Sequence, residues 1–404
     1  MLEYTDVINT DVAWLPQIPA HWQLQKIDAL FTERKTKVSD KDYAPLSVTK
    51  KGILPQLEHA AKSNDSDNHK LVKAGDFVIN SRSDRKGSCG VSKLDGSVSL
   101  INLVLTPRSK LNNDYVHYLL RNYRFSEEYY RNGRGIVADL WTTRYSEMRT
   151  ILLPVPPRAE QDQIVRFLDW KVSEINKLIG IRRQEISLIR QYRELRITER
   201  LKGKKVWLKR LLKSPLQYGA NSSGTDFSSD LPRYIRITDI DSDGNLKQDG
   251  AKSIFEEDAA PYILEDGDIL LARSGATVGK AFLYKKCYGL SAYAGYLIRA
   301  KFDNSRILPE YFMYFTNSST YLDWKNSVFI QATIQNISAE KYGYLPIPLP
   351  SIDEQKRIVN ELDLICKYMD SLVEIKYKEI HALQELKAVI ISDVVTGKID
   401  VRKD

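Results

Sequence analysis

The chain has 404 residues and three widely spaced cysteines, which predicts at least two domains with reduced thiols and excludes a disulfide framework or a cysteine-rich zinc site. Its hydrophobic content of 43% is that of a globular protein, and the absence of a signal peptide or an apolar run of about 18 residues predicts a cytoplasmic protein with no membrane contact. The formal net charge of +8 is compatible with a polyanionic partner such as nucleic acid, and equally with a mildly basic protein of another kind.

Residues 1–157 are predicted to form a first head. Short apolar runs at residues 76–80 and 98–105 are bounded by polar and turn-forming residues, which is typical of strands, and a helical segment follows at residues 114–131. This mixture predicts a β-rich α+β fold. The loops carry basic and hydroxyl side chains, which suit phosphates and base edges. The candidate DNA-binding residues of this head are Lys50, Lys51, Arg82, Ser83, Arg85, Lys86, Arg131, Arg134, Thr142 and Arg144.

Residues 158–205 are predicted to form one long helix. Apolar residues recur every three or four positions from Ile164 to Ile189, no proline interrupts them, and Gly203 provides a stop. A helix of about 40 residues is about 60 Å long. Its apolar stripe requires a partner helix. The segment also has the largest basic excess of the chain, with 13 basic and 7 acidic side chains.

Residues 206–350 are predicted to form a second head with strands near residues 268–272 and 293–298 and a helical segment at residues 309–325. Its 16 basic and 16 acidic side chains cancel, so we expect this head to bind DNA weakly on its own. Arginine suits guanine, and glutamine or asparagine suits adenine, although each such side chain is as readily an ordinary surface residue. The candidates of this head are Thr238, Arg273, Ser274, Thr277, Lys280, Gln331, Thr333, Gln335 and Asn336.

Residues 351–404 are predicted to form the second long helix. Ser351 and Glu354 make a capping box directly after Pro350, and an apolar seam runs from Ile358 to Ile390. The second head begins as soon as the first helix ends, so the second helix has to pack back along the first. We therefore expect an antiparallel two-helix coiled coil that separates the two heads.

The chain repeats itself at an offset of 194 residues. The stretch LPVPPRAEQDQIVRFL at residues 153–168 matches IPLPSIDEQKRIVNEL at residues 347–362. The heads match less well, through Gly-Asp before an apolar run, Arg-Ser after it, and a tryptophan near the start. We therefore expect two copies of one unit related by a pseudo-twofold axis. The matched head residues are Trp22, Gly75, Asp76, Arg82 and Ser83, against Trp207, Gly267, Asp268, Arg273 and Ser274.

No set of catalytic residues is apparent. The segment at residues 275–281 resembles a phosphate-binding loop, but it is one residue short and has Ala281 where a hydroxyl would hold magnesium. An adenine-methyltransferase signature, a histidine pair and a glycine-rich cofactor loop are all missing. The sequence predicts a non-enzymatic protein with no cofactor or metal of its own.

Two unlike heads, each followed by Pro-x-Pro, three residues, Glu-Gln and a long helix, closely resemble the specificity (S) subunit of Type I restriction–modification enzymes. The resemblance covers essentially the whole chain. The residues that carry it, besides the Gly-Asp and Arg-Ser segments, are Pro154, Pro156, Glu160, Gln161, Ile164 and Val165, with Pro348, Pro350, Glu354, Gln355, Ile358 and Val359.

The resemblance implies that each head is a target recognition domain for one half of a bipartite, asymmetric site in double-stranded DNA. It also implies that the helices set the gap between the half-sites and dock two methyltransferase subunits, which bind S-adenosylmethionine, in a complex with ATP-dependent restriction and translocation subunits. Two similar helix entrances would then supply two matching docking sites. The candidate docking residues are Glu160, Gln161, Ile164, Glu354, Gln355 and Ile358.

One departure concerns the loop after each Gly-Asp strand. The first head reads SRSDRKG where the second reads ARSG, so Arg82 and Arg273 need not have equivalent roles.

Three alternatives remain at this point. A free-standing bivalent DNA-binding regulator would use the same loops without a methyltransferase. A coiled-coil adaptor would bind proteins through its heads and leave no DNA footprint. An enzyme with an unfamiliar site would require paired acids, bases, nucleophiles or metal ligands, and the sequence offers none.

Overall fold

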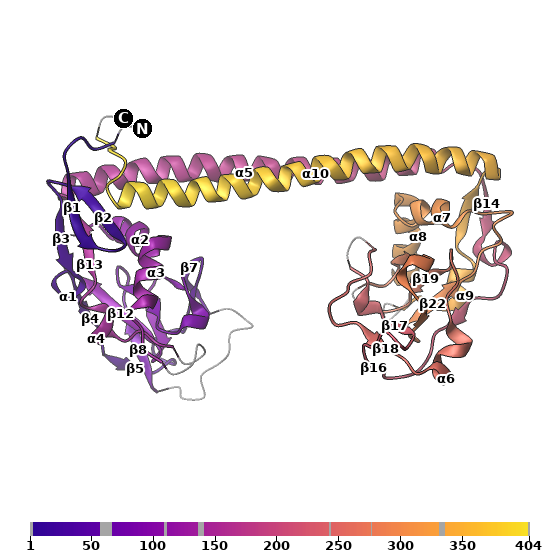
Figure 1. Ribbon diagram of the computed structural model, residues 1–404, viewed down its shortest axis with the longest axis horizontal. Helices are drawn as coiled ribbons and strands as arrows, with labels where there is room; N and C mark the ends of the chain where they lie inside the picture. Colours follow the sequence, from indigo (N-terminus) through magenta and orange to yellow (C-terminus); the bar gives the residue numbers. More distant parts are fainter. Residues whose placement is uncertain are drawn as a thin grey trace. The chain divides into compact units, whose positions relative to one another are not determined.

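The computed structural model describes residues 3–56, 67–108, 111–135, 141–241, 244–275, 277–330 and 336–402, and the chain divides into two compact units (Figure 1). Unit 1 comprises residues 1–182 and 378–404, and unit 2 comprises residues 183–377. The division falls within the two long helices, α5 (Arg158–Arg200) and α10 (Ile352–Val395). Each unit therefore contains a β-rich head, the start of one long helix and the end of the other.

The head of unit 1 is built on a four-stranded antiparallel sheet in the order β10-β9-β12-β4, beside a three-stranded sheet in the order β11-β8-β5. Valines from these strands share a core, because Val72, Val78, Val98 and Val104 are buried against one another. The strands are β1 (Val7–Val12), β2 (Leu15–Pro19), β3 (Gln23–Lys26), β4 (Phe31–Glu33), β5 (Lys37–Val38), β6 (Leu46–Thr49), β7 (Gly52–Pro55), β8 (His69–Val72), β9 (Phe77–Asn80), β10 (Cys89–Val91), β11 (Gly96–Ser99), β12 (Asn102–Pro107) and β13 (Leu152–Val155). The short helices are α1 (Ile27–Leu30), α2 (Asn113–Arg121), α3 (Tyr123–Arg131) and α4 (Tyr145–Met148).

The head of unit 2 contains two four-stranded sheets, in the orders β15-β22-β19-β20 and β16-β18-β17-β21. Only β17 and β21 pair in parallel among the described strands of this head. The strands are β14 (Lys204–Trp207), β15 (Gln217–Tyr218), β16 (Thr225–Asp226), β17 (Arg233–Ile235), β18 (Lys252–Ser253), β19 (Ile269–Ala272), β20 (Ala281–Leu283), β21 (Ser291–Tyr293), β22 (Leu297–Ala300) and β23 (Pro346–Leu349). The short helices are α6 (Glu256–Ala259), α7 (Pro309–Phe315), α8 (Ser319–Ile330) and α9 (Ala339–Gly343).

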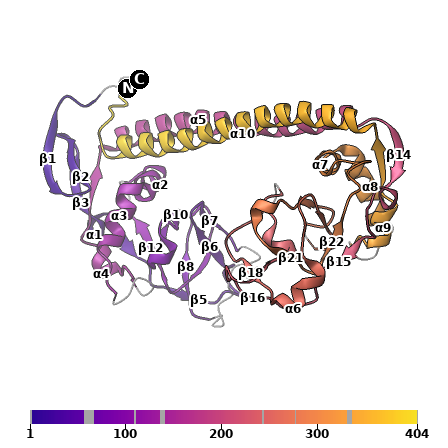
Figure 2. The same cartoon turned by 45° about the vertical axis from the view of Figure 1, so that its right-hand side comes forward.

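The long helices pair antiparallel inside each unit, as the sequence predicts, and both views show them side by side (Figure 1 and Figure 2). Residue numbers rise along α5 as they fall along α10. The polar contacts that fix this direction are Asn176–Lys387 and Arg182–Glu379 in unit 1, and Arg193–Asp370 and Arg200–Glu361 in unit 2. In the described part of the chain, no helix is long and apolar enough to cross a bilayer.

Burial follows the predicted seam of each helix. Ile164, Leu168, Ile175, Ile179 and Ile186 of α5 are buried, as are Ile358, Leu362, Met369, Ile380 and Ile390 of α10. The seam continues into the head: in unit 2, Ile197 and Leu362 share a core with Tyr311 and Phe312 of α7. The head of unit 2 is therefore packed onto the helix that follows it.

A two-stranded ribbon joins the start of each head to the start of its helix, and its register corrects one predicted match. Gln23 lies opposite Val155 in the β3–β13 pair, and Lys204 lies opposite Leu349 in the β14–β23 pair. Lys26 is therefore the counterpart of Trp207. The two tryptophans differ accordingly, since Trp22 is 3% exposed and Trp207 is 43% exposed. Their sequence match was a coincidence of position.

Candidate nucleic-acid interface

The head of unit 1 has a basic depression of about 700 Å³ at the end of β9. It brings together three predicted residues, Arg82, Thr142 and Arg144, which come from two loops that are 60 residues apart in the sequence. Backbone pairing explains their approach. Thr142 forms β-bridges with both Arg82 and Arg134, and the amide of Thr143 donates to the carbonyl of Ser81 at 3.0 Å.

Three further cations line this depression that sequence reasoning did not select: Lys35, Lys70 and Arg149. Lys70 is half-buried, which lowers the pKa of its ammonium group, and its Nζ donates to the carbonyl of Asn102 at 2.8 Å. Among the described residues, Glu33 is the only acidic residue that lines the depression, with its carboxylate 3.2 Å from Lys35 and 3.9 Å from Lys70. Five cations around one carboxylate make this surface electropositive and suited to phosphate.

The other candidates of the first head lie away from the depression or already have acidic neighbours. Lys50 and Lys51 are exposed in the turn between β6 and β7, and Ser83 begins a single 3₁₀ turn. Several cations are paired with acids nearby, which reduces the charge that they can offer to DNA. The pairs are Arg85–Asp84, Lys86–Glu127, Arg131–Glu128 and Arg134–Glu147.

In unit 2, the corresponding loop places Arg273 at the end of β19. The carbon of its guanidinium lies 4.9 Å from the centre of the Tyr218 ring. Ser274 bridges Asn336, and the amide of Ile337 donates to the carbonyl of Arg273 at 2.8 Å. Of the predicted residues, the structure thus unites Arg273, Ser274 and Asn336.

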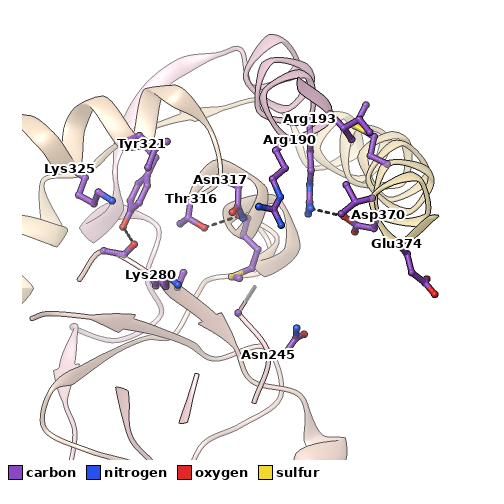
Figure 3. A pocket seen from close by; sticks show the side chains of 18 of the residues that line it. Arg190, Arg193, Asn245, Lys280, Thr316, Asn317, Tyr321, Lys325, Asp370 and Glu374 are labelled. Carbon is purple, nitrogen blue, oxygen red and sulfur yellow. Dashed lines mark hydrogen bonds and ion pairs between the residues drawn. The ribbon is translucent and has the colours of Figure 1, made fainter. Parts of the chain in front are cut away.

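The remaining candidates of the second head are dispersed. Thr238 is exposed in a 3₁₀ turn, and Thr277 lies in the loop that leads to β20. Lys280 lines a separate cavity of about 700 Å³, where Figure 3 shows it opposite Tyr321 and Lys325 of α8. Gln331, Thr333 and Gln335 lie outside the described residues.

Counting from the Gly-Asp turn shows that Arg82 and Arg273 are not equivalent. Asp76 and Asp268 each accept a backbone hydrogen bond from the residue three positions earlier, so they occupy the same place in the two heads. Arg82 follows Asp76 by six positions, but Arg273 follows Asp268 by five. The carbonyl that pairs with Thr143 in unit 1 belongs to Ser81, and the carbonyl that pairs with Ile337 in unit 2 belongs to Arg273. Ser81 is therefore the counterpart of Arg273.

In the repeated helix entrance, a buried glutamine ties the start of the long helix to its own head; we call this arrangement the lock. Gln161 and Gln355 are buried at 1% and 0% exposure. The Oε1 of Gln161 accepts from the amide of Asn112 at 2.9 Å, and its Nε2 donates to the carbonyl of Pro156 at 2.9 Å. Gln355 repeats both bonds with Leu308 (2.9 Å) and Pro350 (3.0 Å). The conformation of the Pro-x-Pro segment and the direction of the helix are fixed by this glutamine.

The two glutamates beside these glutamines differ. Glu160 is buried and accepts from Tyr4 (2.5 Å), His21 (2.7 Å) and Trp22 (3.1 Å). Glu354 instead pairs with Arg357 on the helix surface at 2.5 Å.

Ile164 and Ile358 lie in the apolar seam at 0% and 3% exposure. The side chains of Glu160, Gln161, Ile164, Gln355 and Ile358 are therefore engaged inside their own unit, and their predicted role in docking a partner stays a prediction.

Exposed apolar side chains on the long helices are also repeated. Four positions at an offset of 194 carry large apolar residues in both copies, with exposures between 46% and 72%. Trp170 and Leu364 each lie two residues beyond a buried seam leucine and so occupy the far side of the helix. This outer apolar set comprises Trp170, Ile181, Leu386 and Val389 in unit 1, and Leu364, Ile375, Tyr192 and Leu195 in unit 2.

The spacing of apolar residues along the helix could have revealed this set from the sequence. The buried seam of α5 is already accounted for by other residues, and Trp170 and Ile181 fall on its opposite, polar face. In the described part of the chain there is no group of three or more His, Cys, Asp or Glu side chains that could hold a metal ion.

Comparison with known proteins gives concordant matches. A family model described as "Type I restriction modification DNA specificity domain" matches residues 223–382. The MjaX type I restriction enzyme specificity subunit of Methanocaldococcus jannaschii is 22% identical, over 100% of this chain and 99% of its own. The EcoBI specificity subunit of Escherichia coli is 23% identical, over 64% of this chain and 61% of its own.

The fold is also shared with a solved chain from a study of "complex assembly" and "conformational transition of the type I R-M system". That chain superposes with a TM-score of 0.68 at 15% identity, over 95% of this chain and 99% of its own. At this level of identity, the likeness concerns the fold.

Proposed function

We propose that each of the two heads reads one half of a bipartite, asymmetric DNA site. We also propose that α5 and α10 set the gap between the two half-sites and dock two methyltransferase subunits. Both proposals proceed from the family of the chain, the specificity (S) subunits of Type I restriction–modification systems. As an S subunit, the chain determines the DNA specificity of a Type I complex and is not catalytic. The adaptor and free-standing regulator alternatives have no observation in their favour.

The observation that carries the proposal is the contrast between equal helix entrances and unequal heads. Gln161 and Gln355 make matching hydrogen bonds to matching backbone groups. The loops after β9 and β19 differ by one position in where they place arginine. A protein that presents two unlike DNA sequences to two copies of one enzyme needs two equal connections between head and helix, and two heads that differ.

We assign DNA contact in the first head to the basic depression around Arg82, Thr142 and Arg144, with Lys35, Lys70 and Arg149 as added phosphate contacts. In the second head, we assign it to Arg273, Ser274 and Asn336. The remaining predicted residues of both heads are proposed as peripheral contacts, and several of those in the first head are paired with acids.

We assign methyltransferase docking to the outer apolar set. Large apolar side chains gain stability when a partner removes them from water, at about 25 cal/mol per Å². Four of them recur at the same offset in both units, so one partner surface fits twice. The partner proteins would hold S-adenosylmethionine, and ATP-dependent restriction subunits would complete the assembly.

The test is a base-resolution methylation map of cells with this gene intact, deleted, or carrying a head exchange. Replacing residues 206–350 with the matching head of a relative should change only one half of the methylated motif. Replacing residues 1–157 should change only the other half. A motif that changes throughout after either exchange, or methylation that persists unchanged after deletion, would contradict the proposal.

The role of the helices in setting the gap has its own test. Inserting four residues after Arg182 and four after Tyr377 would lengthen each helix by about 6 Å. Because DNA rises 3.4 Å per pair, the unread gap should widen by about one or two pairs. A gap that stays the same in the methylation map would exclude the helices as the spacer.

A further inference from the structure

Unit 2 contains two buried polar atoms at the end of β19 that have no hydrogen-bond partner among the described residues, the Nε of Arg273 and the Oδ1 of Asn336. Arg273 precedes Ser274, which bridges Asn336, so the two residues belong to one site. Burying a donor or an acceptor without a partner is costly, and folded proteins rarely leave such groups unpaired. A hydrogen-bonding ligand that meets both groups would remove this cost.

The Arg273 guanidinium is held in place by an aromatic ring. Its carbon lies 4.9 Å from the centre of the Tyr218 ring. The ring is itself fixed at both ends, because Tyr218 pairs with Ile298 in the sheet and its hydroxyl accepts from the amide of Ala339 at 3.0 Å. A guanidinium stacked on a ring keeps its in-plane N–H donors available for a planar acceptor pair.

The corresponding site of unit 1 lacks this arrangement. Arg82 occupies the next position along the chain, is exposed, and has no ring in cation–π contact among the described residues. Successive residues of an extended segment project to opposite sides, so Arg82 cannot reproduce the placement of Arg273. The restraint on the arginine is thus a property of the second head.

We propose that Tyr218, Arg273 and Asn336 form a base-reading cluster that requires a G·C pair in the half-site bound by unit 2, an inference that rests on the proposed function. In the major groove, a G·C pair presents N7 and O6 of guanine as acceptors and N4 of cytosine as a donor. Arg273 supplies two N–H donors to guanine, and the Oδ1 of Asn336 accepts from cytosine N4. Tyr218 is a positioning residue that holds the guanidinium.

The experiment uses the full chain in complex with its methyltransferase and a DNA library in which every pair of both half-sites is varied. The wild-type complex should require G·C at one position of the half-site that changes when residues 206–350 are exchanged. Arg273→Lys keeps the charge but loses the planar fork, so preference for that pair should fall by about 10- to 100-fold. Other positions should keep their preferences.

Three further variants separate reading from folding. Tyr218→Phe keeps the ring and should retain the preference, whereas Tyr218→Leu removes the stacking and should reduce it. Arg210→Lys is the matched control, because Arg210 also lies over an aromatic ring, Trp207 at 5.3 Å, outside the cluster. It should leave every preference unchanged.

Two results would overturn the assignment. One is an Arg273→Lys complex that methylates all library members less, by the same factor, with its base preferences intact. The other is a half-site without any required G·C pair. A wild-type complex with no bipartite preference at all would instead refute the proposed function, so the two failures are distinguishable.

Discussion

The two glutamines at the helix entrances have the same environment, whereas the two glutamates that precede them do not. Gln161 and Gln355 are both buried, and each bonds a backbone amide of its head and a proline carbonyl. Glu160 is buried beneath Tyr4, His21 and Trp22, but Glu354 is paired with Arg357 on the surface. In the repeated Glu-Gln pair, the glutamine therefore has the same role in both units, whereas the glutamate has different roles.

The difference shows which residue is needed at both connections between head and helix, and which one has a role that depends on the neighbouring segments. A helix can leave a head in only one direction if the backbone at its entrance is tied down, and the glutamine does this in both units. Among the described residues, the glutamate is buried in unit 1 alone, where Tyr4 of the N-terminal segment covers the entrance. Four sets of variants test this comparison and its extension to the outer surfaces.

The largest effect is expected at the glutamines. Gln355→Ala leaves the amide of Leu308 and the carbonyls of Arg306 and Pro350 without their partner in a buried site. The free energy of unfolding of unit 2 should fall by about 3 kcal/mol, measured by denaturant titration. Glu354→Ala, one residue earlier and on the surface, should leave the free energy of unfolding unchanged within the error of the titration. Equal losses would refute the lock.

The outer apolar set should show equal effects in the two units. Leu364→Ser with Ile375→Ser, or Trp170→Ser with Ile181→Ser, should each weaken one methyltransferase site by about 2 kcal/mol, or about 30-fold in Kd. Mass photometry should show the 2:1 complex replaced by a 1:1 complex. Leu188→Ser is the control, because Leu188 is exposed but its counterpart at the same offset is alanine. If Leu188→Ser weakened methyltransferase binding equally, the repetition of the outer apolar set would no longer indicate the docking surface.

The glutamates should differ between the units. In the wild type, the Glu160 carboxylate accepts from three donors. Glu160→Gln replaces one of its oxygens with an NH₂ group, which cannot accept from them, and should lower the free energy of unfolding by about 1.5 kcal/mol. Glu354→Gln should have no measurable effect, because the ion-pair partner of Glu354 among the described residues is the solvent-exposed Arg357. The comparison would fail if both variants melted at the same temperature, below that of the wild type.

The smallest effects are expected for single phosphate contacts in the basic depression. Lys35→Ala and Arg149→Ala should each reduce the salt slope of DNA binding by about 1, with a loss of affinity of a few fold at fixed salt. Fluorescence anisotropy of the complex over a salt series measures both quantities. Arg131→Ala is the control, since Arg131 is paired with Glu128 outside the depression. A slope that falls equally in the control would place the DNA elsewhere.

Periodicity and repetition predicted the α+β class, the antiparallel helices and the buried seam, because these depend on spacing along the chain. The predicted docking residues have internal contacts as well, because a repeated motif indicates a repeated environment; their role in docking stays a prediction. The match of Arg82 with Arg273 failed because dipeptides were aligned instead of strand ends. Lys35, Lys70 and Arg149 were missed because they are separated in sequence and only the sheet brings them together.

The composition of the units has a consequence for synthesis on the ribosome. Unit 2 is one continuous stretch, residues 183–377, so all of it can fold before the chain is finished. Unit 1 begins first but needs the last residues: α10 brings Lys387 to Asn176, and Arg402 lies 5.0 Å from the Tyr4 ring. Translation that stops after residue 377 would leave unit 2 whole and unit 1 with an uncovered apolar seam. Unit 1 is complete only when residues 378–402 have been translated, so shorter products would expose this seam to proteolysis before they could join a complex.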